Sequence, residues 1–246
     1  MMPTSGSDGS GTGGVGPVPC SAAGAAAADG ERRGSTRTLV VVAHPDPGSL
    51  TAVAATQLQL LLGEADAQVA DLSREGFDPR FSTDDRDVYR GRAQGPSADV
   101  AAEQARVDAV DHLVLVFPVY WWSMPALLKG WVDRVFVGGW AFDEQDGEIV
   151  PRLQRLTVHL LPVSGTSEAA FARHGYAAAF GTQIEHGLID YCGARRGATA
   201  FVHDSESGDH GLVAAAVATA VSQVAAAVRE GHDDHGRRSS GAAVGR

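Results

Sequence analysis

The chain has 246 residues, enough for one domain of ordinary size, and its 44% hydrophobic and 20% charged residues are typical of a soluble globular protein. Its 30 acidic and 20 basic residues give a net charge of −10 with no basic stripe, which argues against a protein built to bind a nucleic-acid backbone. Residues 1–36 and 231–246 consist mainly of small and polar residues, so we expect disordered ends and one folded domain over 37–230.

The cysteine content points to a reducing compartment. Only Cys20 and Cys192 are present, which excludes a disulfide framework. The alanine run at 22–28 lacks strong hydrophobic residues and the usual cationic region before it, so it does not predict a secretory signal. We therefore expect a cytoplasmic protein.

Two uncharged runs have to be distinguished from membrane spans. Residues 113–128 are too few for a membrane-spanning helix and are interrupted by Pro118 and Pro125, so they predict a buried strand and a loop. Residues 211–228 are mostly alanine, with valines on one stripe at helical spacing, which predicts a terminal helix packed on the core. We expect no membrane span.

Hydrophobic runs alternate with amphipathic stretches along the domain. We expect strands at 38–43, 68–72, 112–117, 156–163 and 197–202, and helices at 49–62, 98–110, 126–137, 176–191 and 211–228. The polar residues 73–97 predict an excursion over the surface, and 138–147 a turn-rich stretch. This alternation predicts an α/β fold with a doubly wound, five-stranded parallel sheet of the flavodoxin-like order 2-1-3-4-5 and helices on both faces. Ligands bind such sheets at the carboxyl ends of the strands, which draws attention to loops 44–51, 118–125 and 163–175.

The loop after the first strand offers groups that suit a phosphate. It lacks G-x-G-x-x-G and G-x-x-x-x-G-K-[ST], which argues against a Rossmann dehydrogenase and a nucleoside triphosphatase. Ser49 and Thr51 stand at a helix start, where free N–H groups and the helix dipole attract anions, and His44 adds a ring donor. The alternative, in which His44 only ends a strand and Ser49 only caps the helix, remains open.

The loop after the central strand carries three successive aromatic residues between two prolines. Tyr120, Trp121 and Trp122 lie between Pro118 and Pro125, where a core needs no such cluster. A planar conjugated ring could stack on this rigid wall while backbone N–H groups reach its heteroatoms. Alternatively, one of the two tryptophans belongs to the core, since tryptophan is highly buried on average.

A family resemblance rests on this loop and the helix after it. The stretch Phe117–Phe136, FPVYWWSMPALLKGWVDRVF, resembles the signature of the flavodoxin-like NAD(P)H:quinone oxidoreductase family. That family includes mammalian quinone reductases, bacterial drug-activity modulators and the ancillary flavoproteins of potassium efflux systems. The resemblance extends over residues 38–205, and it includes the His44-Pro45 pair, Gly139–Phe142 and Tyr191–Gly193.

The resemblance implies a homodimer that binds FAD, or FMN as the alternative, at the carboxyl edge of the sheet. NAD(P)H reduces the flavin and a quinone reoxidises it. The implied flavin contacts are His44, Ser49, Leu50 and Thr51 at the phosphates, Pro118, Val119, Tyr120, Trp121 and Trp122 along the ring, and Ser164 and Gly165 at the ring edge. The last two come from Val163–Thr166, where the family has Thr-Thr-Gly-Gly.

The resemblance also suggests catalytic residues. Mammalian members place a Tyr and a His, six residues apart, over the flavin; the His aligns with His174, but the Tyr position holds Glu168. An imidazole could stabilise the charge that develops on the flavin during hydride transfer. Tyr176 or Phe171 could fill the vacated space, and we name His174 and Tyr176 as the catalytic candidates. A loop histidine is more often a surface residue, and this alternative remains open.

We expect the other charged residues and histidines to have structural rather than catalytic or metal-binding roles. Lys129, the only lysine, and Arg134 are expected at the surface or a dimer interface. The pairs His203/Asp204 and His232/His235 have spacings that fit no standard metal site, so no metal is expected.

The leading hypothesis is a flavin-dependent NAD(P)H oxidoreductase that transfers hydride to a quinone by a ping-pong, two-electron mechanism. The alternative is a regulatory flavoprotein subunit of a membrane transporter, like the potassium-efflux ancillary members. A third hypothesis is a small one-electron carrier without a nicotinamide site.

Overall fold

The computed structural model describes residues 38–93 and 95–241. In chain order its elements are β1 (Thr38–Val42), α1 (Leu50–Leu62), β2 (Ala67–Asp71), α2 (Thr83–Tyr89), α3 (Ala98–Asp108), β3 (His112–Pro118), α4 (Ala126–Val135), β4 (Phe142–Gln145), β5 (Glu148–Pro151), β6 (Thr157–Val163), α5 (Glu168–Arg173), α6 (Tyr176–Phe180), the π-helix η1 (Gly181–Asp190), β7 (Arg195–Thr199) and α7 (His210–Gly241). The predicted disorder of residues 1–36 lies outside the described residues.

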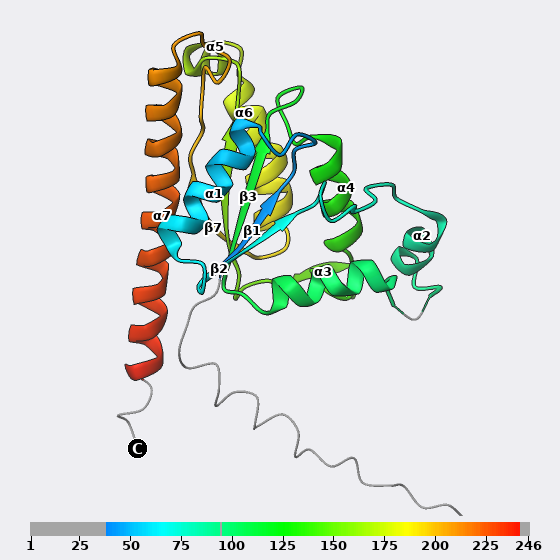
Figure 1. Ribbon diagram of the computed structural model, residues 1–246. Helices are drawn as coiled ribbons and strands as arrows, with labels where there is room; N and C mark the ends of the chain where they lie inside the picture. Colours follow the sequence, from blue (N-terminus) through cyan, green and yellow to red (C-terminus); the bar gives the residue numbers. More distant parts are fainter. Residues whose placement is uncertain (1–37, 94, 242–246) are drawn as a thin grey trace, which may run out of the picture. The chain divides into compact units, whose positions relative to one another are not determined.

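Five strands form one parallel sheet in the order β2-β1-β3-β6-β7, which confirms the predicted flavodoxin-like topology. Successive side chains of a strand enter opposite layers. Leu39 and Val41 of β1 pack in the core shared with α3, α4 and η1, whereas Val40 and Val42 pack in the core shared with α1 and α7. Burial on both faces explains why the central strands are continuous hydrophobic runs (Figure 1).

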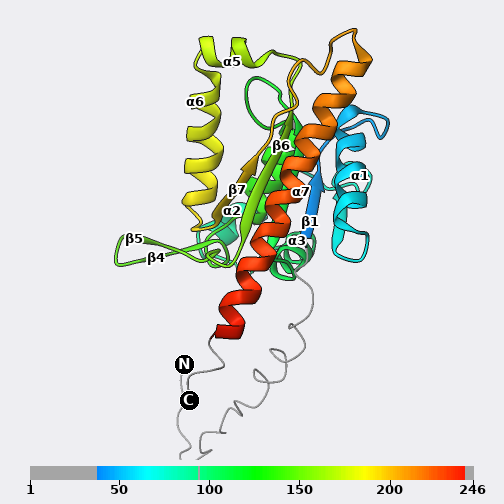
Figure 2. The same cartoon turned by 90° about the vertical axis from the view of Figure 1, so that its left-hand side faces the viewer.

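Helices α1 and α7 lie side by side on one face of the sheet (Figure 2). The segment His210–Gly231 of α7 is long and apolar enough to cross a membrane by length and composition, with a mean hydropathy of 1.9. Its valines 217, 221, 224 and 228 are all buried in the core on that face. This packing accounts for the hydrophobic stripe, as predicted for a terminal helix.

The excursion after β2, residues 73–97, packs on α4, and this corrects the expectation that Arg134 lies at the surface. The side chain of Arg134 is only 7% exposed, and its Nε lies 3.0 Å from the Asp85 carboxylate. Nη1 lies 2.8 Å from Asp99 and donates to the carbonyl oxygen of Asp78. Arg134 is therefore a buried anchor of the excursion, because the segment that was expected to run over the surface covers it.

Some predicted boundaries differ from the structure. The expected strand at 197–202 is β7 at Arg195–Thr199, and the single helix expected at 176–191 consists of α6 followed by η1. The turn-rich stretch contains part of the β4–β5 hairpin, which projects from the sheet (Figure 2). Helix α7 continues to Gly241, so residues 231–241 of the tail that was expected to be disordered are helical, and the rest of that tail lies outside the described residues.

Candidate functional site

Three loops meet at the carboxyl edge of the sheet. They follow β1, β3 and β6, which are neighbouring parallel strands. The N–H of Val119 in the second loop donates to the carbonyl of Val163 at the end of β6, with an N···O distance of 2.8 Å. The loops predicted to form the site are therefore brought together, with the one after β3 between the other two.

The first loop ends in a helix start with free donors. Ser49 caps α1, since its Oγ accepts a hydrogen bond from the N–H of Ala52 at 3.2 Å. The N–H groups of Leu50 and Thr51 have no acceptor among the described residues. Because the first N–H groups of a helix point out of its N-terminus, an anion there would find two donors and the positive end of the helix dipole. Ser49 is thus a cap, as the alternative held, and the N–H groups of Leu50 and Thr51 beside it are left for a ligand.

His44 and Asp46 shape the same loop. His44 Nδ1 lies 3.0 Å from the N atom and 3.2 Å from the carbonyl oxygen of Asp46, so the ring is held to the loop backbone through Nδ1. The Asp46 carboxylate accepts the N–H of Gly48 at 2.8 Å. His44 therefore keeps Nε2 for a ligand, whereas Asp46 places a negative charge in the loop.

The second loop makes a tight turn with unusual backbone angles. Tyr120 and Ser123 exchange two backbone hydrogen bonds of 3.1 Å, with Trp121 and Trp122 between them. Both tryptophans have positive φ, 48° and 64°, in positions that glycine and asparagine normally occupy. Their N–H groups have no acceptor within the described part of the chain. Such strain is concentrated at functional sites, and here it leaves two backbone donors free at the sheet edge.

The two tryptophan side chains have different surroundings. Trp121 is 91% exposed. Trp122 stacks on Tyr176 with ring centroids 3.7 Å apart and planes 8° from parallel, and it meets the edge of Phe171. Trp122 thus belongs to an aromatic cluster, whereas Trp121 presents its ring to solvent.

The third loop is shorter than expected. Its Ser164 is buried, and its hydroxyl accepts the N–H of Thr166 at 3.1 Å, while the N–H of Gly165 has no acceptor among residues 38–93 and 95–241. The prediction of a loop over residues 163–175 is wrong for Glu168–Arg173, which form helix α5. Ser167 caps this helix, because its hydroxyl accepts the N–H of Ala170.

His174 follows α5 directly and is exposed. Its ring lies 5.4 Å from that of Tyr176, centroid to centroid, and Arg173 Nη2 lies 3.4 Å from its Nε2. Because Tyr176 also stacks on Trp122, the second loop and the α5–α6 region are joined by a column of three rings. The two catalytic candidates are thus adjacent, next to the aromatic turn.

A pocket of about 580 Å³ opens beside this turn and was not anticipated from the sequence. Its walls come from α2, the end of the second loop, α4 and η1, and they include Met124, Phe136 and Ile184. Arg86 of α2 and Arg90, which follows that helix, supply positive charge. These segments are far apart in sequence, so only the fold reveals the pocket, although part of its wall comes from the Phe117–Phe136 signature.

The remaining polar residues lie outside these three loops or bond within them. Lys129 is exposed and pairs with Asp133 at 2.5 Å, which confirms its surface position. No group of three metal-binding side chains occurs among the described residues. His203 instead bonds the carbonyl of Thr166, and the side chains of His232 and His235 lie outside the described set.

Comparison with known proteins agrees with this architecture. The family model described as "Flavodoxin-like fold" matches residues 36–227. Ribosyldihydronicotinamide dehydrogenase [quinone] of Mus musculus is 30% identical over 185 residues, which cover 64% of this chain and 77% of that protein.

Solved structures give the same fold. An NAD(P)H:quinone oxidoreductase from Methanothermobacter marburgensis has a TM-score of 0.67 at 22% identity, covering 76% of this chain and 94% of that one. An FMN-dependent NADH-azoreductase from Bacillus anthracis, solved with FMN, has a TM-score of 0.60 at 14% identity, covering 79% and 98%. The chain therefore belongs to the flavodoxin-like family in which these quinone and NAD(P)H oxidoreductases are found.

Proposed function

We propose that this protein is a flavin-dependent oxidoreductase that takes hydride from NAD(P)H and delivers it to a quinone or a similar acceptor in a ping-pong sequence. The observation that carries the proposal is the set of free backbone N–H groups at three adjacent strand ends, beside a strained pair of tryptophans. The mouse relative is a ribosyldihydronicotinamide dehydrogenase named for a quinone, which supports the acceptor class.

The residues at the edge fit a flavin. The N–H groups of Leu50 and Thr51 would hold a phosphate, with Ser49 and His44 beside it. The N–H groups of Trp121, Trp122 and Gly165 would donate to the ring's oxygen and nitrogen acceptors, with Pro118, Val119, Tyr120 and Ser164 along the ring. We propose FAD as the cofactor, with FMN as the alternative, and the azoreductase neighbour bound to FMN supports a flavin of either kind.

The bound flavin would supply the two-electron chemistry, and the chain's residues position the reactants. Trp121, exposed and rigidly held, offers a stacking surface for a planar ring. His174 would donate a hydrogen bond where negative charge develops, and Tyr176 holds the imidazole by stacking. An open position above the ring would serve the nicotinamide and then the acceptor, as a ping-pong sequence requires.

We further propose that the protein acts in the cytoplasm as a homodimer. The pocket beside the aromatic turn has apolar walls from α4 and η1, a surface that a second copy could cover. Equilibrium sedimentation of the purified protein would test the dimer, and a monomer at micromolar concentration would contradict it.

The central test is purification of the full chain, release of its flavin by heat and identification of the flavin. The holoprotein is then mixed with NADH or NADPH, and a quinone is added afterwards. We expect bleaching of the yellow colour by a nicotinamide, its return with the quinone, and parallel double-reciprocal plots. A protein without flavin, or a flavin that neither nicotinamide reduces, would overturn the proposal.

A further inference from the structure

The segment after β7 is bound to the third loop of the site through the carbonyl group of Thr166. Within the described part of the chain, this oxygen accepts hydrogen bonds from His203 Nδ1 at 2.9 Å, the Ser164 hydroxyl at 3.3 Å and the N–H of Asp204 at 3.5 Å. The His203 bond is the shortest of these. Since a carbonyl oxygen can only accept, His203 carries a proton on Nδ1 and donates it to the loop.

This bond fixes the loop on the far side of Gly165, whose N–H has no acceptor among the described residues. The carbonyl of Ser164, in the same peptide group as that N–H, accepts the N–H of Ser205 at 3.0 Å. A single hydrogen bond leaves the peptide free to turn about it. The bond from His203 to Thr166 gives the loop a second fixed point, so that the two together determine where the Gly165 N–H points.

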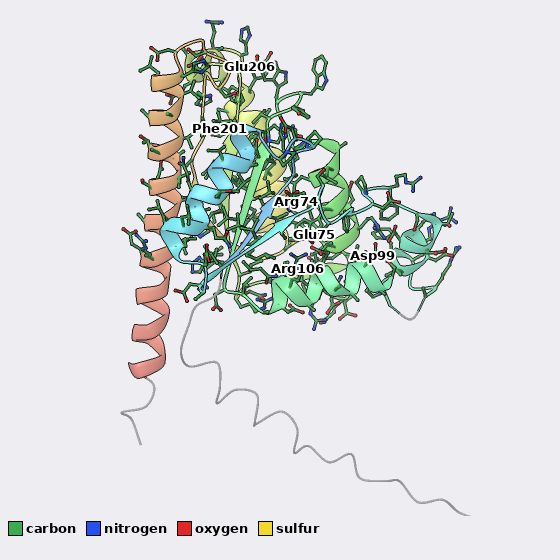
Figure 3. All side chains as sticks on the ribbon, in the orientation of Figure 1. Arg74, Glu75, Asp99, Arg106, Phe201 and Glu206 are labelled. Carbon is green, nitrogen blue, oxygen red and sulfur yellow. The ribbon has the colours of Figure 1, made fainter. Side chains whose placement is uncertain are left out.

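The His203 ring is itself held by aromatic residues. It lies parallel to the ring of Phe201, with centroids 5.0 Å apart and planes inclined by 7°, and it meets the edge of Phe171 at 5.2 Å. Phe171 is buried and also meets the ring of Trp122 edge to face, at 5.9 Å. Phe201 and Glu206, which flank the segment that carries His203, are labelled in Figure 3, and Glu206 lies at the end of the molecule where α7 begins. The imidazole is therefore packed between the third loop and the aromatic cluster of the second.

We propose that His203 is a positioning residue of the flavin site: by holding the Thr166 carbonyl, it directs the N–H of Gly165 toward the acceptors of the flavin ring. This inference rests on the proposed function. A donor that is fixed in place stabilises the negative charge that the ring gains when it takes up hydride. Loss of the His203 bond should therefore weaken flavin binding and also make the bound flavin harder to reduce.

Two variants separate the hydrogen bond from the ring. His203→Phe keeps an aromatic ring against Phe201 but cannot donate to Thr166. His203→Asn loses the ring, but its amide N–H lies close to the position of Nδ1 and can still donate. His210→Phe serves as the control, because His210 is exposed at the start of α7.

The test measures flavin affinity and the reduction potential of the bound flavin in the full-length protein. Quenching of FMN and FAD fluorescence, after the protein's own flavin has been removed, gives the Kd, and equilibration of the holoprotein with a redox dye gives the potential. We expect His203→Phe to raise the Kd about five- to tenfold, as for a lost hydrogen bond, and to shift the potential to a more negative value. His203→Asn and His210→Phe should stay within about twofold of the wild-type Kd and keep its potential.

Urea unfolding of the same variants distinguishes positioning from a purely structural role. A lower free energy of unfolding in His203→Phe with an unchanged potential would overturn the inference, as would equal losses in His203→Phe and His203→Asn. If His203→Phe does not fold, His203→Gln takes its place, because its amide N–H lies farther from the backbone than Nδ1. These results leave the proposed function intact, whereas a wild-type protein that takes up no flavin would overturn both.

Discussion

Trp122 and Tyr176 stack face to face, with ring centroids 3.7 Å apart and planes inclined by 8°. The contact joins the turn after β3 to the start of α6. It covers one face of the Trp122 indole, while the neighbouring Trp121 stays exposed. The two tryptophans therefore have different tasks, because one anchors the strained turn and the other offers a free aromatic surface.

Single alanine variants should separate these tasks. Trp122→Ala removes a packed aromatic ring, so we expect the free energy of unfolding to fall by about 2 kcal/mol. Trp121→Ala should leave stability within about 0.5 kcal/mol and weaken flavin binding about tenfold, because an exposed side chain contributes to the ligand more than to the fold. Urea unfolding and flavin titration measure the two effects. The double variant should lose its flavin, and if it keeps its yellow colour, the ring lies elsewhere.

We expect Arg134 to contribute to stability, and Lys129 on the same helix provides a control. Arg134→Ala leaves the buried Asp85 carboxylate without its cation, so we expect a loss of about 3 kcal/mol in the free energy of unfolding. Lys129→Ala removes the exposed pair with Asp133 and should cost less than about 1 kcal/mol. Equal losses for the two variants, measured by urea unfolding, would show that the excursion does not depend on Arg134.

Most of the fold could be predicted because its signals are local. The hydrophobic runs of β1 and β3 indicate strands buried on both faces, and the loops at their carboxyl ends, one suited to a phosphate and one rich in aromatic residues, indicate the site. The β4–β5 hairpin also had a local signal that was overlooked. Asp146-Gly147 is a two-residue turn with φ of 54° and 83°, a typical hairpin dipeptide between two short polar strands.

The features that could not be predicted depend on long-range contacts. The burial of Arg134 depends on Asp85, from an excursion whose own sequence is polar and uninformative, and on Asp99 at the start of α3. From the sequence alone, a charged residue on a helix is expected at the surface. Only the fold shows that another segment covers it.

The Asp85 carboxyl should make stability depend on pH in the acid range. Burial raises its pKa, but hydrogen bonds from Ser82 and Arg134 outweigh this and hold the pKa below the ordinary value of an aspartic acid. A carboxyl with a lowered folded-state pKa stabilises the protein above the unfolded pKa, and this stabilisation is lost as pH falls below about 4. Unfolding free energies measured from pH 3 to 6 should show a steeper acid loss for wild type than for Asp85→Asn. Parallel curves would assign the acid loss to other groups.

Cys192 should be an inert thiol. Burial raises its pKa to about 11, so the reactive thiolate is scarce at neutral pH. In a Cys20→Ser variant, where Cys192 is the only cysteine, we expect a disulfide reagent to react slowly in the native protein and rapidly in urea. Rapid labelling of the native variant would show that the adjoining pocket admits the reagent to this thiol.

His174 carries the prediction that bears most directly on catalysis. Its exposed imidazole stacks on Tyr176, which positions the ring beside the aromatic turn without burying it. If it stabilises charge during hydride transfer, His174→Ala should retain its flavin but be reduced by NAD(P)H about ten to a thousand times more slowly. Tyr176→Phe keeps the stacked ring and removes only the hydroxyl, so it separates a positioning role from a shared chemical one. Stopped-flow reduction at saturating nicotinamide gives both rates. A His174→Ala rate equal to wild type would make this histidine a surface residue, whereas slow reduction in Tyr176→Phe alone would transfer the catalytic role to the tyrosine hydroxyl.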